Sequence, residues 1–236
     1  MQDAELDDLS KQINLPAPLR PYQWEGVHFL LGSDSALLAD QMGLGKTVQV
    51  AVALSLLLPK YKLGRALIIV PASLRINWRR ELESWANNLT VRALTGNYQE
   101  RRAQYLLPIN VLIVSYEQVR EDYLTLSELA NFDVVILDEA QRIKNSGTET
   151  ALACRILSRN RAWALTGTPI ENRVRDLVSI FRFIAPTLLK MSMTRVEMHK
   201  QMKPFFLRRL KEEVLPELPE IIMQDIPLEL NDLRYQ

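Results

Sequence analysis

The sequence has few of the residues that build cross-links or metal sites. Cysteine occurs once in 236 residues, at Cys154, which excludes a disulfide or a cluster of thiolate ligands within the chain. Neither His28 nor His199 has other ligand residues grouped around it, which argues against a structural zinc site. No apolar stretch approaches the ~20 residues that cross a bilayer, and the acidic start MQDAELDD is unlike a signal peptide. We therefore expect an intracellular protein, in a prokaryotic cytoplasm or a eukaryotic nucleus, with no membrane partner.

An excess of charge of one sign is also absent. The 29 basic and 28 acidic residues leave a formal net charge of +1, so any affinity for nucleic acid has to come from a local patch. Apolar residues make up 47% of the chain and charged residues 24%, a balance typical of globular proteins. A chain of this length can bury a substantial core.

The stretch LLADQMGLGKT, residues 37–47, runs from an apolar strand through a glycine turn into an apolar helix. Glycines in such a turn let successive backbone N–H groups point at one anion, a lysine adds positive charge, and a threonine hydroxyl can hold Mg²⁺. The pattern predicts a site for a nucleoside triphosphate and Mg²⁺. The predicted contact residues are Gly43, Leu44, Gly45, Lys46 and Thr47.

One position departs from the usual phosphate-binding pattern, because Asp40 stands where a glycine is expected five residues before Gly45. A second signal supports the site. Residues 132–140, FDVVILDEA, contain a four-residue apolar run, 134–137, that is followed by two adjacent carboxylates, as expected of a buried parallel strand. Asp138 can bind Mg²⁺ directly or through water, and Glu139 can accept a proton from the water that attacks the terminal phosphorus.

Apolar runs alternate with segments of helical period along the chain, which predicts an α/β fold with a parallel sheet covered on both faces. The expected strands are 36–39, 66–70, 91–94, 111–114, 134–137 and 162–165. The expected helices are 47–58, 74–86, 99–106, 118–130, 148–158 and 173–184. Residues that follow the strands should share one edge of the sheet, where ligands bind in such folds.

The composition changes towards the C-terminus. Residues 188–214 are rich in methionine and basic side chains, and two prolines follow, which indicates a boundary. We expect a lead-in over 1–14, a nucleotide-binding lobe over 15–217, and a linker with the start of a second, missing lobe over 218–236.

Several further motifs occur in a fixed order along the chain. They are LRPYQ ending at Gln23, VPASLRINW at 70–78, VSYE at 114–117, DEAQRIKN at 138–145, LTGTPIEN at 165–172 and LRRLKEEVLPELP at 207–219. From residue 15 onward the chain resembles the Swi/Snf-type ATPases, which are chromatin-remodeller-like members of the superfamily-two helicases. The resemblance implies the N-terminal RecA-like lobe of such a protein, a P-loop ATP hydrolase.

The resemblance also implies roles for single residues. Gln23 would read the adenine edge, Lys46 and Thr47 would serve phosphate and Mg²⁺, and Asp138 and Glu139 would serve metal and water. A side-chain amide suits the N6 and N7 edge of adenine, and no Asn-Lys-x-Asp element for guanine is present, so we expect ATP rather than GTP. The segment that would couple nucleotide state to DNA is Thr166, Gly167, Thr168 and Pro169.

Two positions depart from the family pattern. Gln41 replaces a common glutamate, and Gln141 replaces the histidine that commonly closes the DEAH box. Glutamine can still hydrogen-bond across to the coupling segment, but it cannot take up a proton near neutral pH. We therefore place Gln141 among the nucleotide-site residues and expect nucleotide binding to persist, with altered coupling.

The resemblance implies a translocase that moves along duplex DNA and closes two lobes around ATP. The second lobe would supply an arginine finger, worth about a thousandfold or more in rate. We expect this chain alone to bind ATP weakly and to hydrolyse it at a trace rate. Other subunits of a larger complex are further candidate partners.

The candidate DNA contacts are polar residues that follow the strands. A helix N-terminus favours phosphate, which makes Ser73 a better candidate than Arg75, Arg79 and Arg80, for which the solvated face of a helix is favoured. For the remaining candidates, a simple strand end or a helix cap is an equally good interpretation. These candidates are Ser115, Lys144 and Asn145.

Two other readings of the chain stay open, a strand-separating DNA or RNA helicase lobe and a non-catalytic, nucleotide-dependent interaction module. The presence of both Lys46 and Glu139 argues against the module, because a scaffold has no physical need for them. Cys154 is expected to pack as a small apolar residue. The tryptophans, expected in core or interlobe packing rather than in base stacking, are Trp24, Trp78, Trp85 and Trp163.

Overall fold

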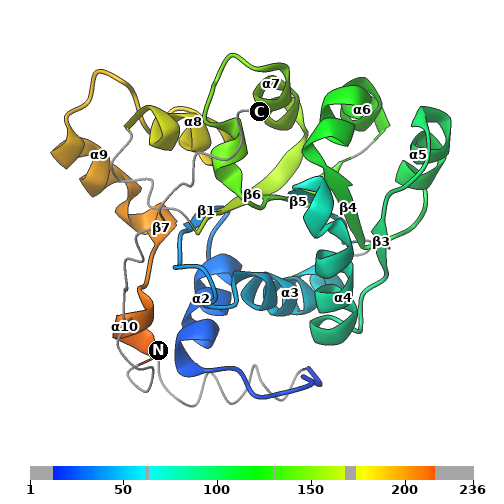
Figure 1. The fold of residues 1–236 in the computed structure, drawn as a ribbon, viewed down its shortest axis with the longest axis horizontal. Helices are drawn as coiled ribbons and strands as arrows, with labels where there is room; N and C mark the ends of the chain where they lie inside the picture. The colour runs from blue at the N-terminus through cyan, green and yellow to red at the C-terminus, as the bar shows by residue number, and fades with distance from the viewer. Residues whose placement is uncertain (1–12, 62–63, 130, 168–173, 216–236) are drawn as a thin grey trace, which may run out of the picture.

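The computed structural model describes residues 13–61, 64–129, 131–167 and 174–215. Within these ranges, seven parallel strands form one sheet in the order β3-β4-β2-β5-β6-β1-β7, and helices cover both of its faces (Figure 1). The predicted α/β fold is confirmed. The strands are β1 (Ser35–Leu38), β2 (Ala66–Val70), β3 (Val91–Ala93), β4 (Val111–Ser115), β5 (Phe132–Leu137), β6 (Arg159–Leu165) and β7 (Phe206–Leu207).

The α-helices are α2 (Pro21–Leu31), α3 (Lys46–Leu57), α4 (Arg75–Trp85), α5 (Tyr98–Tyr105), α6 (Tyr116–Leu129), α7 (Glu149–Ile156), α8 (Val174–Ile184), α9 (Arg195–Met202) and α10 (Lys211–Val214). Short 3₁₀ helices span Leu58–Lys60, Ala72–Leu74, Ala140–Ile143 and Lys203–Phe205. Among the described helices, none is both long and apolar enough to cross a bilayer.

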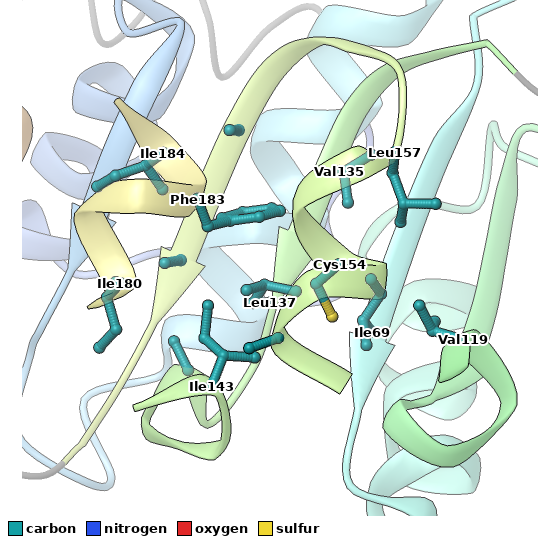
Figure 2. Packing of buried hydrophobic residues seen from close by; sticks show 14 of the residues in the cluster. Ile69, Val119, Val135, Leu137, Ile143, Cys154, Leu157, Ile180, Phe183 and Ile184 are labelled. Atoms are coloured by element: carbon teal, nitrogen blue, oxygen red, sulfur yellow. The ribbon is translucent and has the colours of Figure 1, made fainter. Parts of the chain in front are cut away.

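The two faces of the sheet carry separate cores because successive side chains of a strand point to opposite sides. In β5, Val135 and Leu137 pack with α5, α6, α7 and α8, whereas Val134 and Ile136 pack with α2, α3 and α4. Figure 2 shows the first of these cores, where Cys154 of α7 and Phe183 of α8 lie close to β5. Cys154 is buried, as predicted for a small apolar residue.

Helix α3 is buried along most of its length, with every residue from Gln49 to Leu57 shielded from solvent. The helix can be buried because most of its side chains are apolar, and it packs against the sheet and between α2 and α4 (Figure 1). This packing fixes the start of α3, where the glycine turn ends. Since all strands are parallel, the loops after β1, β2, β4, β5 and β6 open on one edge of the sheet.

Every strand and helix expected from the sequence is present, with ends that move by a few residues. The largest shift is in β6, which begins at Arg159 instead of 162. Elements in parts of the chain left unassigned above are α2, α9, α10 and the two-residue strand β7, which pairs with β1. The segment 206–214, formed by β7 and α10, is called the C-terminal arm below.

Candidate nucleotide-binding site

The phosphate loop, residues 39–47, joins β1 to α3 through two glycines with left-handed backbone geometry. Gly43 has φ of 90° and Gly45, the N-cap of α3, has φ of 74°. Residues that carry a side chain rarely adopt this backbone geometry, so the turn depends on glycine. A β-carbon added at Gly45 would lie 2.6 Å from Nε2 of Gln23, which places the predicted adenine-reading residue against the loop.

Lys46 lies at the first turn of α3, with its ammonium directed back over the loop. Its Nζ donates to the carbonyl oxygens of Asp40 at 2.6 Å and Gln41 at 3.3 Å. Burial lowers the pKa of Lys46, and the carboxylates of Asp138 and Glu139 are among the charges that oppose this shift. The loop therefore holds a partly desolvated cation close to two acidic groups.

The acid pair follows β5, as predicted. Asp138 is 8% exposed, and its carboxylate accepts hydrogen bonds from Nε1 of Trp78 at 2.7 Å and from the backbone N–H of Glu139 at 2.9 Å. Burial raises the pKa of Asp138, while the Trp78 donor holds it down. The hydroxyl of Tyr116 fixes the turn by donating to the Asp138 carbonyl at 2.7 Å.

Glu139 stands out in the backbone of this turn. Its φ of 50° is the only positive φ of a non-glycine residue among the described positions. Such geometry costs of order 1–3 kcal/mol and persists where the surroundings hold it. The turn directs Glu139 towards the loop, since both line one cavity.

A single cavity of about 340 Å³ is lined by the phosphate loop and the acid pair. Its lining includes Gly43, Gly45, Lys46, Thr47, Trp78, Asp138 and Glu139. The structure therefore brings the two sequence signals together across the ends of β1 and β5. A larger cavity of about 630 Å³ lies beside edge strand β3, away from these residues, so volume alone does not locate the site.

Gln141 joins the acid pair to the end of β6. Its Nε2 donates to Oε2 of Glu139 at 2.5 Å, and its Oε1 accepts from the hydroxyl of Thr166 at 3.0 Å. The hydrogen bond expected between Gln141 and the coupling segment is thus present. Gly167 also borders the phosphate loop, because a β-carbon there would lie 2.4 Å from Cγ of Met42. The two remaining coupling residues, Thr168 and Pro169, lie outside the described residues.

Gln23 lies between the start of α2 and the phosphate loop. Its Oε1 accepts from the backbone N–H of Arg20 at 2.9 Å, which closes the first turn of α2, and its Nε2 lies at Gly45. The adenine role of Gln23 stays a prediction.

The candidate DNA contacts lie after β2, at the last residue of β4 and after β5, and they differ in exposure. Ser73 is exposed in the 3₁₀ helix before α4, whereas Ser115 is buried and its hydroxyl accepts from the backbone N–H of Gln118 at 3.2 Å. Lys144 and Asn145 are exposed beside a cavity of about 280 Å³. Their roles stay predictions.

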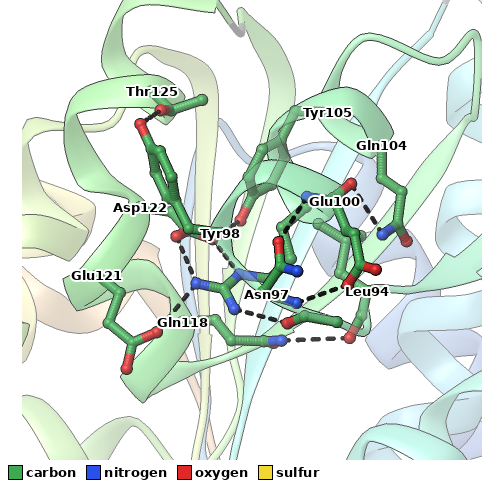
Figure 3. Close-up of polar contacts among 12 residues, drawn as sticks. Leu94, Asn97, Tyr98, Glu100, Gln104, Tyr105, Gln118, Glu121, Asp122 and Thr125 are labelled. Atoms are coloured by element: carbon green, nitrogen blue, oxygen red, sulfur yellow. Dashed lines mark hydrogen bonds and ion pairs between the residues drawn. The ribbon is translucent and has the colours of Figure 1, made fainter.

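The solvated-face interpretation is wrong for Arg75. Its Nη1 donates to the carbonyl of Leu94 at 2.6 Å and to Oε1 of Gln118 at 3.2 Å, and the residue is half-buried. Figure 3 shows Gln118 bonded to Leu94, so Arg75, Leu94 and Gln118 join α4, the segment after β3, and α6. Periodicity could not reveal this, because the partners lie 19 and 43 residues away. Arg79 and Arg80 are exposed, as expected.

Sequence reasoning missed several residues of the site. Trp78 was expected only to pack, yet it also donates to Asp138. Gln49 and Arg209 were given no role, and both are buried beneath the phosphate loop. The motif LRRLK marked the arm as part of the resemblance, but no local pattern predicts where it docks.

A P-loop nucleotide-binding lobe is the class that this fold and site define. The SNF2-related domain model matches residues 22–236, and the chain belongs to that family. It is 39% identical to an uncharacterized ATP-dependent helicase of Mycoplasma pneumoniae over 100% of this chain and 25% of the relative. It is 33% identical to the chromatin remodeling factor mit1 of Schizosaccharomyces pombe over 92% of this chain and 17% of mit1.

A solved structure with this fold is the Sulfolobus solfataricus SWI2/SNF2 ATPase core in complex with dsDNA. The TM-score is 0.78 at 33% identity, over 87% of this chain and 48% of the core. The chain thus spans about half of this core and a quarter or less of the curated relatives named above.

Proposed function

We propose that the chain is the N-terminal ATP-binding lobe of an ATP-dependent duplex-DNA translocase. The observation that carries the proposal is the shared cavity, in which Lys46 and Thr47 face Asp138 and Glu139. Membership of the SNF2-related domain family and similarity to an ATPase core solved with dsDNA support both the nucleotide and the DNA partner.

The residues of the cavity fit a nucleoside triphosphate. Lys46 would exchange a loop carbonyl for a phosphate oxygen, and the N–H groups of the turn and of the first turn of α3 would bind the same anion. Thr47 and Asp138 offer the oxygen ligands that Mg²⁺ prefers. Mg²⁺, when bound, would neutralise charge on the phosphates.

Glu139 would act as the general base. Its carboxylate accepts from Gln141, which leaves the second oxygen to orient water and take its proton. Gln141 and Thr166 would carry the state of the site to the segment after β6. Ser73, Ser115, Lys144 and Asn145 would then contact duplex DNA at the same sheet edge.

A second RecA-like lobe would complete the motor by adding an arginine that stabilises the transferring phosphoryl group. Without it, the rate should fall by about a thousandfold or more. We therefore expect trace hydrolysis by this chain, with or without duplex DNA, and a rise when a longer form of the protein is assayed. Turnover of several per second by this chain alone would refute the need for a second lobe.

The role of Glu139 is tested in the longer form of the protein. Glu139→Gln should abolish turnover while ATP binding persists, because only the proton acceptor is lost. Glu128→Gln is the matched control, since it neutralises an exposed carboxylate in α6. Unchanged turnover of Glu139→Gln would remove that residue from the role. A strand-displacement assay on the same protein separates a translocase, which should leave strands paired, from a strand-separating helicase.

A further inference from the structure

The C-terminal arm is part of the phosphate loop's support. Strand β7 pairs with β1, with Phe206 opposite Leu37 and Leu207 opposite Leu38. The backbone pairing then continues into the loop, where Ala39 N–H donates to the Leu207 carbonyl at 2.7 Å and Gln41 N–H donates to the Arg209 carbonyl at 3.0 Å. Figure 1 shows the arm descending beside α2 from the end of the sheet.

A buried ion pair fixes the arm beneath the loop. Arg209 donates to the Asp40 carboxylate through Nη2 at 2.6 Å and Nε at 3.1 Å, and the side chains are 8% and 0% exposed. Arg209 Nη2 also donates to Oε1 of Gln49 at 3.0 Å, and Nη1 donates to the Tyr22 carbonyl. Asp40 is the residue that replaces the usual glycine of the phosphate-binding pattern. The arm thus supplies a countercharge to this buried carboxylate, which also accepts from Nε2 of Gln49 at 3.2 Å.

The same two loop residues hold both the arm and the phosphate-binding lysine. Asp40 and Gln41 accept from Lys46 through their carbonyls. Their side chains hold the arm, Asp40 through Arg209 and Gln41 through the backbone N–H of Lys211 at 2.7 Å. The arm and the Lys46 ammonium are thus held by the same two residues of the loop.

The arm also touches the glycine turn. A β-carbon added at Gly43 would lie 3.1 Å from Cε and 3.2 Å from Nζ of Lys211. The turn is thus confined between the arm on one side and Gln23 at Gly45 on the other.

We propose that Arg209 is a positioning residue for nucleotide binding, and that docking of the C-terminal arm and occupation of the phosphate loop strengthen each other. The inference rests on the proposed function. Linkage requires that if the docked arm raises nucleotide affinity, then nucleotide stabilises the docked arm by the same factor.

The test compares two buried arginines of this chain. Arg209→Met removes the countercharge of Asp40, and Arg101→Met removes that of Asp122 on α6. The second pair is an apt control, because Arg101 Nε lies 2.6 Å from Asp122 with side-chain exposures of 7% and 0%, in the α5–α6 network around Asp122 and Glu121 in Figure 3. Both variants leave a buried carboxylate, but only Asp40 lies in the phosphate loop.

Affinity is measured with a fluorescent N-methylanthraniloyl derivative of ATP and Mg²⁺, below the melting temperature of each variant. Arg209→Met should bind the nucleotide at least about tenfold more weakly, about 1.4 kcal/mol, because the loop carbonyls that position Lys46 lose the support of the arm. Arg101→Met should stay within about twofold of the wild type. Equal affinities for the wild type and Arg209→Met, or equal losses in both variants, would overturn the inference. No binding by the wild-type chain would instead count against the proposed function.

A second measurement does not depend on whether Arg209→Met folds. Hydrogen exchange in the wild-type chain reports the arm through the Lys211 amide, whose acceptor is the Gln41 side chain. Saturating nucleotide should slow hydrogen exchange across 208–215 at least about threefold. Gln41→Ala should reduce both this protection and the affinity for the nucleotide. Exchange of the arm that does not respond to bound nucleotide would refute the linkage.

Discussion

The hydrogen bond between Trp78 and Asp138 gives the sharpest test of the site's electrostatics. Trp78 is 1% exposed, and its N–H is the side-chain donor to a carboxylate that is itself 8% exposed. Trp78→Phe removes this donor and keeps an aromatic ring in the core. We expect the fold to lose stability and the pKa of Asp138 to rise further, because the hydrogen bond favours the ionised form.

The magnitude follows from two contributions. A hydrogen bond to a charged group contributes about 1.5–3 kcal/mol. The smaller ring leaves a void that costs about 1 kcal/mol. Together they give about 3 kcal/mol, which in a chain of this size lowers Tm by about 6–12 °C.

The pH dependence of this loss has a definite sign. Burial raises the pKa of Asp138 in the folded chain above its unfolded value, so the ionised carboxylate weakens the fold at neutral pH. That weakening disappears as the pH falls through the raised pKa. The difference in the free energy of unfolding between wild type and Trp78→Phe should therefore be largest near neutral pH and should decrease as the pH is lowered.

The assay is urea unfolding of four proteins: wild type, Trp78→Phe, Asp138→Asn and the double variant. Once Asp138 carries no charge, the loss of the indole donor should matter less, so the two changes should couple by at least about 1 kcal/mol. Additive effects, or a stability difference between wild type and Trp78→Phe that does not narrow as the pH is lowered through the acid range, would refute the reasoning.

Three further outcomes are expected. Gln141→Ala in the longer form of the protein should lower single-turnover hydrolysis about tenfold or more with nucleotide affinity within about twofold, because Gln141 contacts Glu139 rather than the loop; equal rates would remove its positioning role. Lys46→Met should abolish binding of the fluorescent nucleotide without lowering Tm, because the buried ammonium weakens the fold at neutral pH and this cost disappears only above the unfolded pKa of lysine; a large fall in Tm would contradict this. Arg101→Met should lose about 3–5 kcal/mol in urea unfolding, and Arg101→Met with Asp122→Leu should recover part of it; no recovery would show that the stranded carboxylate is not the cause.

Much of the fold was predictable because its signals are local. Strand β2 matches the expected range 66–70, and α3 begins one residue before the expected 47. The approach of Lys46 to the acid pair was also predictable, since parallel strands bring their carboxyl ends to one edge. These inferences need only the order and direction of the strands.

The parts that escaped prediction depend on contacts distant in sequence. From the sequence, Asp40 is a departure from the phosphate-binding pattern with no evident reason, because its partner, Arg209, lies 169 residues away. Strand β7 has only two residues, which is too short for a period of hydrophobic residues to be detected. Trp78 looked like a core residue, and it is one, but the use of its N–H is set by the turn after β5.

Strand β7 has a consequence for synthesis on the ribosome. Until residues 206–209 emerge, β1 has an open edge on the side that β7 later covers, and Asp40 has no arginine beside it. Open strand edges pair readily with other chains. A nascent chain that stalls short of this point would therefore carry an aggregation-prone strand edge next to a phosphate loop that lacks its support.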